Sequence, residues 1–491
     1  MLQEILALSL IQLAGAVTAT ALYRLSTEGG ARFYLIRWSG LLNFTLTFFR
    51  FCLLWSECLQ IPTVWFDEAS VLWSASLDWY WSFGLDGIGM GMLLLTAFIM
   101  PICMLSVWEN TEYAFDQVVN CLVAIHLCLT AAFVVTDLFL FYIAFETVLI
   151  PMFLLIGVWG SRVERIKAAY YFFFFTLVGS ILLLVAIIMI YTSTGTTALF
   201  DIALTPELQL LLWLPVFVSF AVKMPIFPMH IWLPEAHVEA PTVGSVILAG
   251  LLLKLGGYGF VRYMLTLFTD ASVNAFYWPV VVSLGMCGII FASLTALRQL
   301  DVKRIVAYSS VAHMNLVLIG IFALNYEGLH GAYLMMIGHG FVSSGMFLAI
   351  GILYDRYHSR LIKNYGGLVQ LMPLFSVLFL MLSFANMGFP GSYNFVGELL
   401  IITGAFKLSF WIGFFAATGM LLSGFYSVWL LNRVVFGDLN VTFLSRFYDV
   451  DGREFSMLGL LVLVTILYGV APTMIDSLVA ESLKEVIALH Q

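Results

Sequence analysis

The sequence predicts an all-α polytopic membrane protein with about fourteen transmembrane helices. Of its 491 residues, 62% are hydrophobic and only 10% are charged, which excludes an ordinary soluble protein and a disordered one. Apolar stretches of about 20 residues recur along the chain, and each is long enough to cross a bilayer as a helix. These stretches lack the alternation of polar and apolar residues that a membrane β-barrel requires.

The apolar stretches define the candidate spans in order along the chain. They cover residues 4–23, 33–55, 85–107, 114–134, 137–158, 167–192, 208–228, 242–266, 276–297, 302–323, 328–354, 368–406, 409–432 and 456–475. The N-terminus has no basic region before its first apolar run, so we expect that run to be retained as a helix. We expect the last residues, 476–491, to form a short amphipathic tail.

The basic residues test this order of spans. Loops after even-numbered spans hold or border only Arg50, Arg262 and Lys407, with Lys484 in the tail. Loops after odd-numbered spans hold or border many more: Arg24, Arg32, Arg37, Arg162, Arg165, Lys167, Arg298, Lys303, Arg304, Arg356, Arg360, Lys363, Arg433, Arg446 and Arg453. By the positive-inside rule, this bias places both termini on the outer side of the membrane.

Two of the predicted spans are interrupted. The seventh ends at Pro225 and Pro228, and the twelfth carries the run 386–392, Asn-Met-Gly-Phe-Pro-Gly-Ser, in its middle. Such breaks are tolerated at membrane depth only where protein or water satisfies the freed backbone groups. The breaks lie five spans apart, and this odd offset indicates inverted repeats with functional sites near the broken helices.

The repeats predict a division of the chain into four parts. Residues 1–110 form an N-terminal three-helix segment, and residues 111–266 form the first five-helix repeat, spans 4–8. Residues 272–435 form the second, inverted repeat, spans 9–13, and residues 436–491 form the last helix and the tail.

Titratable residues occur inside the predicted spans, where they are costly and usually functional. They run from an acid through bases and imidazoles to a second acid, and they are Glu146 in span 5, Lys223 just before the first break, Lys254 at the centre of span 8, His313 in span 10, His339 in span 11 and Glu398 after the second break. A buried lysine beside a carboxylate holds its proton, whereas one without that partner tends to release it. A conformational or electrostatic change at the pair formed by Glu146 and Lys223 could therefore drive a proton to Lys254.

Histidines suit the following steps, because imidazole exchanges protons near neutral pH. We expect His313 and His339 to relay the proton, with room for water beside the glycine next to His339, and Glu398 to be the last acceptor. Structural alternatives remain for each residue: a static ion pair for Glu146 with Lys223, hydrogen bonding between helices for the histidines, and a helix cap for Glu398.

Other polar residues carry weaker signals. His230, Glu235, His237 and Glu239 are expected near a membrane surface, as solvated or interhelical groups, and helix capping explains Asp137 and Asp301. Six scattered cysteines without a CxxC pair, and a spacing of seven between His230 and His237, support neither an iron–sulfur cluster nor a zinc site. No basic patch suggests nucleic acid.

At these motifs the chain resembles the antiporter-like, proton-translocating membrane subunits of respiratory complex I. The resemblance is carried by the runs 220–259, 138–146, 307–315, 337–347 and 388–398, and it covers roughly residues 85–435. Further runs at 158–162, 167–176, 298–315, 353–360 and 365–368 are similar to the chain 4 branch of the family, especially its mitochondrial members.

The resemblance implies fourteen helices with two inverted five-helix repeats. It also implies roles for the matching residues: Glu146 and Lys223 as the loading pair, Lys254 as the central lysine, His313 and His339 as the connection, and Glu398 as the terminal residue. Related branches carry a lysine at that last position, so the glutamate is typical of the chain 4 branch.

We therefore expect a membrane-arm subunit of complex I that moves protons, driven by NADH:ubiquinone oxidoreduction in partner subunits. The expected partners are other membrane-arm subunits, including neighbouring antiporter-like chains, and the lipid bilayer. No cofactor motif occurs on the chain itself. We expect the mitochondrial inner membrane, with a bacterial plasma membrane as the alternative.

Three other functions stay open at this point. An Mrp-type sodium/proton antiporter subunit would share the same polar chain, but it would work without a redox enzyme. A structural scaffold would use the charges only to hold helices together. A small-solute transporter would need a substrate pocket.

Overall fold

A computed structural model describes residues 1–25, 29–60, 64–74, 79–108, 114–440 and 448–490, without the side chains of 16–35 and 72–79. The basic residues Arg24, Arg32 and Arg446, used above for the orientation, lie outside the described side chains. Within the described residues, eleven helices are long and apolar enough to cross a membrane. The predicted class, an all-α polytopic membrane protein, is therefore confirmed, whereas the count of fourteen spans stays a prediction.

The chain divides into two compact units, and neither unit is continuous in sequence. The first contains residues 1–220, 258–272 and 475–491, and the second contains 221–257 and 273–474. This division follows packing. The division into inverted repeats stays a prediction.

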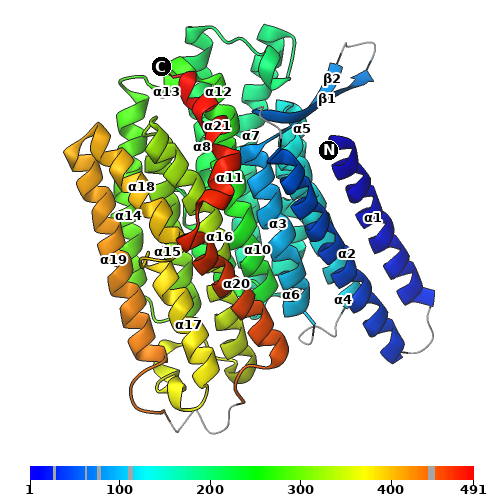
Figure 1. The fold of residues 1–491 in the computed structure, drawn as a ribbon, viewed down its shortest axis with the longest axis vertical. Helices are drawn as coiled ribbons and strands as arrows, with labels where there is room; N and C mark the ends of the chain where they lie inside the picture. The colour runs from blue at the N-terminus through cyan, green and yellow to red at the C-terminus, as the bar shows by residue number, and fades with distance from the viewer. Residues whose placement is uncertain (26–28, 61–63, 75–78, 109–113, 441–447, 491) are drawn as a thin grey trace. The chain divides into compact units, whose positions relative to one another are not determined.

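Long neighbouring helices build the first unit (Figure 1). Its elements are α1 (Leu2–Leu25), α2 (Gly29–Cys58), β1 (Trp65–Ser74), β2 (Trp79–Asp86), α3 (Gly87–Ser106), α4 (Phe115–Val134), α5 (Leu138–Thr147), α6 (Leu149–Trp159), α7 (Arg165–Thr194), η1 (Leu199–Asp201), most of α8 (Pro206–Lys223), η3 (Phe260–Met264), α12 (Leu265–Leu267), α13 (Thr269–Ser272) and most of α21 (Thr473–Ala488). Helices α1 to α4 pack on one another in order along the chain.

The second unit holds both helix breaks. Its elements are α9 (Trp232–Glu239), α10 (Thr242–Ile247), the π-helix η2 (Leu248–Leu252), most of α11 (Leu253–Gly259), α14 (Tyr277–Leu297), α15 (Val302–Ile321), α16 (Tyr326–Tyr357), η4 (Ile362–Asn364), η5 (Leu368–Gln370), α17 (Pro373–Asn386), α18 (Tyr393–Leu408), α19 (Phe410–Val434) and α20 (Gly452–Val470). Its helices α15 and α16 are nearly all buried, which makes them the centre of this unit.

Protein groups satisfy the backbone at the first break, as the sequence predicts. Trp232 donates its indole N–H to the carbonyl of Val222 at 3.0 Å. The Asn315 side-chain amide lies 3.4 Å from the carbonyl of Pro225 and accepts from the Phe227 N–H, also at 3.4 Å. A buried amide from α15 thus replaces part of the helical bonding that the prolines interrupt.

The second break is a turn between α17 and α18. Gly388 adopts a left-handed φ of 71°, which a residue with a side chain rarely takes. Ser392 then caps α18 by accepting from the Phe395 N–H at 3.4 Å.

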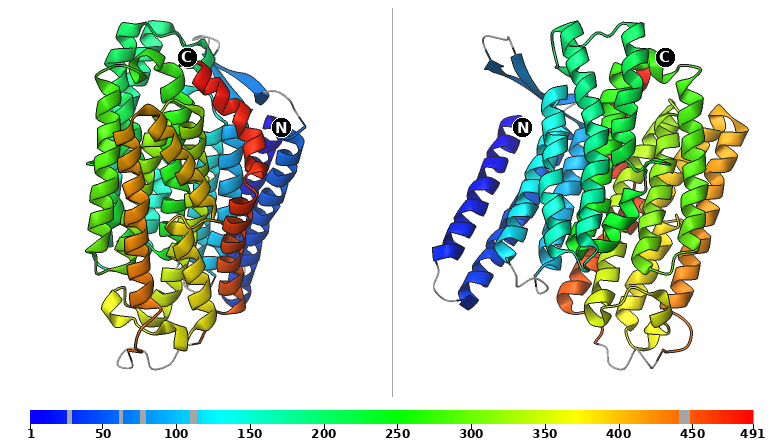
Figure 2. Two further views of the ribbon diagram at one scale, coloured as in Figure 1. Left: turned by 60° about the vertical axis from the view of Figure 1, so that its left-hand side comes forward. Right: turned by 180° about the vertical axis from the view of Figure 1, so that it is seen from behind.

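A β-hairpin precedes the third span, and the sequence did not predict it. Strands β1 and β2 pair antiparallel, with Val71 opposite Trp81 and Ala69 opposite Phe83 (Figure 2). The predicted amphipathic tail is confirmed as α21, whose buried residues recur at helical spacing: Ile475, Leu478, Val479, Ser482, Leu483, Val486 and Ile487. The Ser482 hydroxyl accepts from the Gly87 N–H at 3.2 Å, which ties this helix to the start of α3.

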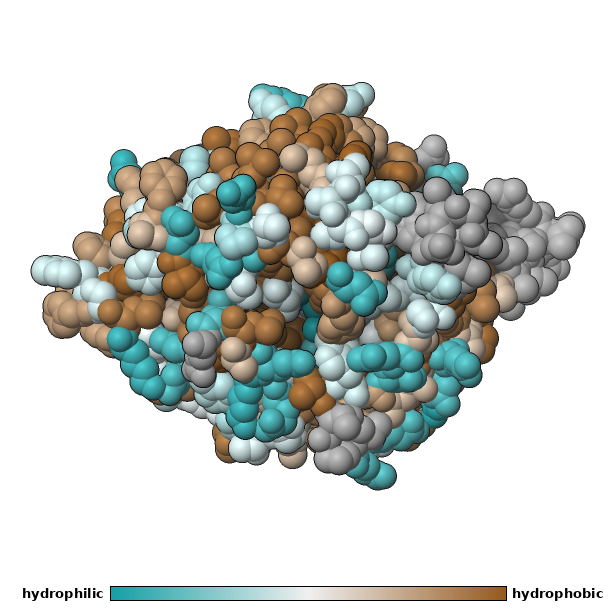
Figure 3. Space-filling model, turned by 90° about the horizontal axis from the view of Figure 1, so that it is seen from above, coloured by the Kyte–Doolittle hydropathy of each residue, from teal (hydrophilic) through white to brown (hydrophobic). Residues whose placement is uncertain are grey.

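The exposed side chains differ in polarity from one part of the surface to another. In the view from above, hydrophilic residues in teal spread over the face together with hydrophobic residues in brown (Figure 3). The long helices present large exposed apolar side chains instead, among them Phe174, Val178 and Leu421. This distribution fits helices whose outer surfaces meet lipid.

Candidate functional site

Lys254 lies in a helical stretch that departs from α-helical geometry. The π-helix η2 redirects the Leu253 N–H to the carbonyl of Leu248. Lys254, only 1% exposed, donates its ammonium to the carbonyl of Ala249 at 2.5 Å. The π-turn therefore supplies a backbone acceptor that holds the amine in place, and π-turns of this kind are frequent at functional sites.

The same amine meets an imidazole of α16. Lys254 Nζ lies 2.8 Å from His339 Nδ1, and His339 is completely buried. This distance permits direct proton transfer between the two nitrogens. With a protonated amine, His339 Nδ1 accepts and its Nε2 carries the hydrogen.

Two further groups continue the series. The rings of His313 and His339 lie 5.6 Å apart between centroids. His313 Nδ1 then lies 3.4 Å from Glu398 Oε1, and both side chains are at most 4% exposed. The structure thus brings four of the six predicted residues into one row within the second unit, in the spatial order Lys254, His339, His313, Glu398.

Glu398 depends on the second break for its space. A Cβ added to Gly388 would meet Glu398 Oε2 at 2.2 Å. The structural alternative for Glu398, a helix cap, is not what the structure shows, since the Ser392 side chain caps α18. The break therefore leaves a gap that the carboxyl group occupies.

Gly338, one of the two glycines beside His339, lies against α18, since a Cβ there would meet Asn394 Oδ1 at 2.5 Å. Gly331 and Gly397 likewise let the backbones of α16 and α18 approach closely. These small residues bring Glu398 towards the histidines by tight helix packing. The room for water expected beside His339 stays a prediction.

Several buried atoms of this row lack a hydrogen-bond partner among the described residues. They are His339 Nε2, His313 Nε2, both oxygens of Glu398, and the side-chain amide atoms of the neighbouring Asn394. Buried polar atoms nearly always have a partner in protein or water. The unpaired atoms therefore mark where water can complete the row.

The predicted loading pair divides between the two units. Glu146 is half-buried at the end of α5 in the first unit. Lys223, 4% exposed, ends α8 in the second unit. The pairing of these two residues stays a prediction.

Two of the residues expected to be solvated or interhelical near a membrane surface, His237 and Glu239, are buried in the protein and are therefore not solvated. His237 is completely buried and stacks on Phe347 at 4.6 Å. Glu239, 3% exposed, pairs with Arg360 at 3.2 Å, and Lys303 donates to the carbonyl of Ala240 at 2.6 Å. The partner of Glu239, Arg360, lies 121 residues away in the segment between α16 and η4, and it gave no local signal in the sequence.

The first unit contains a buried ion pair that the sequence did not indicate. Arg262 of η3 pairs with Asp86 at the end of β2, and both side chains are at most 4% exposed. The guanidinium also lies 4.6 Å from the centroid of the Trp65 ring. The pair joins the hairpin to the helical stretch that follows α11.

The two predicted caps have opposite outcomes. Asp137 accepts from the Leu140 N–H at 2.8 Å and caps α5, so that prediction is confirmed. Asp301 begins α15 without a side-chain cap bond. Within the described residues, no group of three His, Cys, Asp or Glu side chains could hold a metal ion.

Comparison with known proteins decides the family. The family described as "NADH:quinone oxidoreductase/Mrp antiporter, TM" matches residues 135–426. NADH-ubiquinone oxidoreductase chain 4 of the alga Chondrus crispus is 48% identical over 87% of this chain and 87% of its own length. The chain belongs to the NADH-ubiquinone oxidoreductase chain 4 family.

Solved structures agree with this assignment. A chain of respiratory complex I from Thermus thermophilus, at 27% identity, matches with a TM-score of 0.87 over 99% of this chain and 100% of that one. A chain of the Mrp complex from Dietzia sp. matches with a TM-score of 0.83 at 18% identity, which supports the fold alone. The predicted resemblance to complex I is confirmed, as is the expectation of a multi-pass inner-membrane protein, and the chain 4 relatives are eukaryotic.

Proposed function

We propose that this chain moves protons across the mitochondrial inner membrane as a membrane-arm subunit of complex I. Membership of the chain 4 family supports the setting. The buried row Lys254, His339, His313 and Glu398 supports the mechanism, and it is the observation that carries the proposal. The energy comes from NADH:ubiquinone oxidoreduction in partner subunits, since we expect no cofactor on this chain.

Transfer begins between Lys254 and His339. Their nitrogens are within hydrogen-bond reach, so the proton can pass from Nζ to Nδ1 without a mediator. The products are a neutral amine and an imidazolium. The Ala249 carbonyl holds the amine in place during this step.

The next step needs a bridge. The ring centroids of the two histidines are 5.6 Å apart, and the Nε2 atom of each has no protein partner among the described residues. One water between the two Nε2 atoms would transfer the proton from His339 to His313. From His313 the proton reaches Glu398 Oε1, 3.4 Å away, after a small approach.

Glu146 and Lys223 supply the loading step in this proposal. When the pair is close, Lys223 holds its proton, and when the pair separates the proton is released towards Lys254. Contact with neighbouring membrane-arm subunits would drive the separation. The six residues then act as one relay.

The Mrp-type alternative is weaker. The Mrp structure matches at 18% identity, whereas chain 4 relatives reach 48%. Co-purification of this chain with NADH-oxidising activity would distinguish the two.

The test replaces Lys254 by methionine, which keeps the length of the side chain and removes the titratable amine. We expect the assembled complex to oxidise NADH with proton pumping reduced about 100-fold or more. Lys407→Met is the matched control, because Lys407 is 58% exposed and pairs only at the surface with Glu327, and it should pump normally. Normal pumping by the assembled Lys254→Met complex would refute the relay and favour a structural scaffold.

A further inference from the structure

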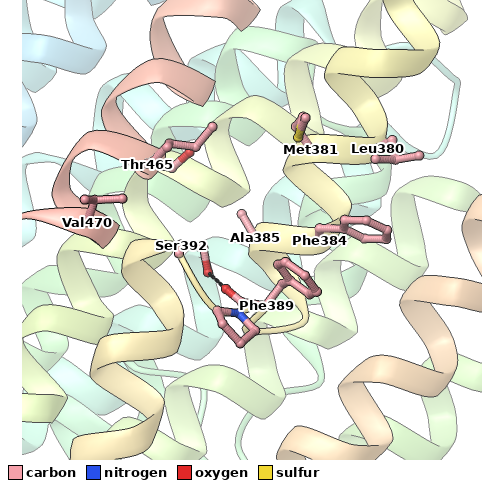
Figure 4. A pocket seen from close by; sticks show the side chains of 11 residues that line it. Leu380, Met381, Phe384, Ala385, Phe389, Ser392, Thr465 and Val470 are labelled. Atoms are coloured by element: carbon pink, nitrogen blue, oxygen red, sulfur yellow. Dashed lines mark hydrogen bonds between the residues drawn. The ribbon is translucent and has the colours of Figure 1, made fainter.

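A cavity lies beside the second helix break. Its volume is about 380 Å³, and α17, the break and α20 line it (Figure 4). Leu380, Phe384 and Ala385 form one wall, and Thr465 and Ile466 form the opposite wall. Phe389 and Ser392 of the break close the end between them (Figure 4).

The walls of the cavity are mainly apolar. Ser392 already donates its hydroxyl to the carbonyl of Phe389 at 2.7 Å, and Thr465 donates to the carbonyl of Val462 at 2.8 Å. The remaining lining side chains are apolar. The occupant that fits this chemistry is therefore a hydrocarbon.

The lipid around the helices is a source of such a hydrocarbon. Val377 and Met381 of α17 are 56% and 42% exposed, and Ile466 and Val470 of α20 are 43% and 74% exposed. In a membrane-spanning helix such a surface meets lipid tails. At the roughly 30 Å³ that one water occupies in the liquid, the cavity holds about a dozen groups of methylene size.

The cavity borders the part of the fold that positions Glu398. Ser392 caps the helix that carries Glu398, and Gly388 leaves the space for its carboxyl group. On the other side, a Cβ added to Gly469 would meet the Gly391 carbonyl oxygen at 2.3 Å, so α20 packs directly on the break. Filling the cavity would hold the break between two helices.

We propose that one acyl chain of a membrane phospholipid occupies this cavity and braces the break that carries Glu398. Every residue that lines the cavity lies in the second unit. Occupancy is independent of the proton relay. Only its effect on Glu398 rests on the proposed function.

The first experiment labels the site. The intact complex is placed in vesicles of phosphatidylcholine that carries a photoreactive diazirine in one acyl chain, and the labelled residues are mapped by mass spectrometry. We expect labelling of Met381, Phe384 and Ala385 to exceed that of the exposed Val377 several-fold. Equal labelling, or a crosslink from the cavity to a partner protein instead of lipid, would overturn the proposal.

A variant sharpens the result. Ala385→Phe fills the cavity from α17 and should abolish labelling there, whereas Val377→Phe, on the exposed face of the same helix, should leave it unchanged. Persistent labelling in the Ala385→Phe complex would contradict the site. If the variant does not assemble, the labelling of the cavity residues relative to Val377 in the unmodified complex still tests the proposal.

The brace is tested by backbone amide exchange of residues 386–398. Removing lipid with detergent should speed exchange several-fold, and adding phosphatidylcholine back should reverse it. In the Ala385→Phe complex, exchange should be slow in both conditions. An exchange rate that does not change with lipid would contradict the stabilisation of the break by the acyl chain. Neither labelling nor exchange depends on pumping, so a failure of this proposal is distinguishable from a failure of the proton relay.

Discussion

Two sets of buried charged groups, one in each unit, are arranged in opposite ways. In the first unit, Arg262 has fixed partners in Asp86, the Tyr258 hydroxyl at 3.3 Å and the Trp65 ring. In the second unit, Lys254, His339, His313 and Glu398 form an open row with unpaired polar atoms. A charged pair with fixed partners stabilises the fold, whereas a row with unpaired polar atoms can transfer a proton. The arrangement of the partners, rather than burial, therefore distinguishes a structural role from a role in transport.

Breaking the closed pair should have the largest effect, and it should be on stability. Arg262→Met leaves Asp86 buried without its partner, which costs about 3–5 kcal/mol of folding free energy. Thermal unfolding and the yield of assembled complex measure this loss. Adding Asp86→Asn, which keeps the cap on the Gly89 N–H, should restore most of the stability, and the complex that assembles should pump normally. Loss of pumping without loss of stability would contradict a purely structural role for the pair of Arg262 and Asp86.

Changing the open row should affect pumping instead. Glu398→Gln keeps the shape of the side chain but cannot accept the proton, so we expect pumping to fall roughly 100-fold with little change in unfolding. Glu398→Asp should retain part of the activity. Glu327→Gln, at a surface pair with Lys407, is the control and should pump normally. A large drop in thermal stability for Glu398→Gln would instead indicate a structural charge.

A smaller effect should follow from closing the space beside Glu398. Gly388→Ala places a side chain at a left-handed φ of 71°, at a cost of about 1–2 kcal/mol, and its Cβ displaces the carboxyl group. We expect both stability and protons pumped per electron to fall. Gly424→Ala in α19 is the control, because a Cβ there meets nothing within 4 Å. If Gly388→Ala pumps like Gly424→Ala, the position of Glu398 does not matter.

The smallest effect concerns pH. Burial keeps the pKa of His237 well below its usual range, and the positive charges of Lys303 and Lys254 lower it further. Below the usual pKa of about 6.5 the unfolded chain binds a proton that the folded chain does not, so stability should fall by up to about 1.4 kcal/mol for each pH unit. His237→Phe, which preserves the stack on Phe347, should reduce this acid sensitivity, measured as thermal inactivation between pH 7 and 5.5. An unchanged pH profile would mean that His237 is accessible to protons in the folded state.

Local signals predicted the helices and the two breaks. Long apolar runs and prolines act through neighbouring residues, so the interrupted helix at Asn386–Ser392 was visible in one stretch of sequence. The two strands were missed because their residues, such as Val71 and Trp81, pair at a distance along the chain and show no long apolar run. The ion pair of the buried Glu239 was not predicted for a related reason, since its partner Arg360 is far along the chain.

By itself the sequence determined which titratable residues lie in the apolar stretches and which helices break, because residue type and backbone propensity are local properties. Only the tertiary structure decided the order of the row, with His339 rather than His313 next to Lys254, and the burial of His237. Contacts between α11, α15, α16 and α18 set that order. Such contacts depend on close packing at glycines, and the sequence does not show which helix packs against each glycine.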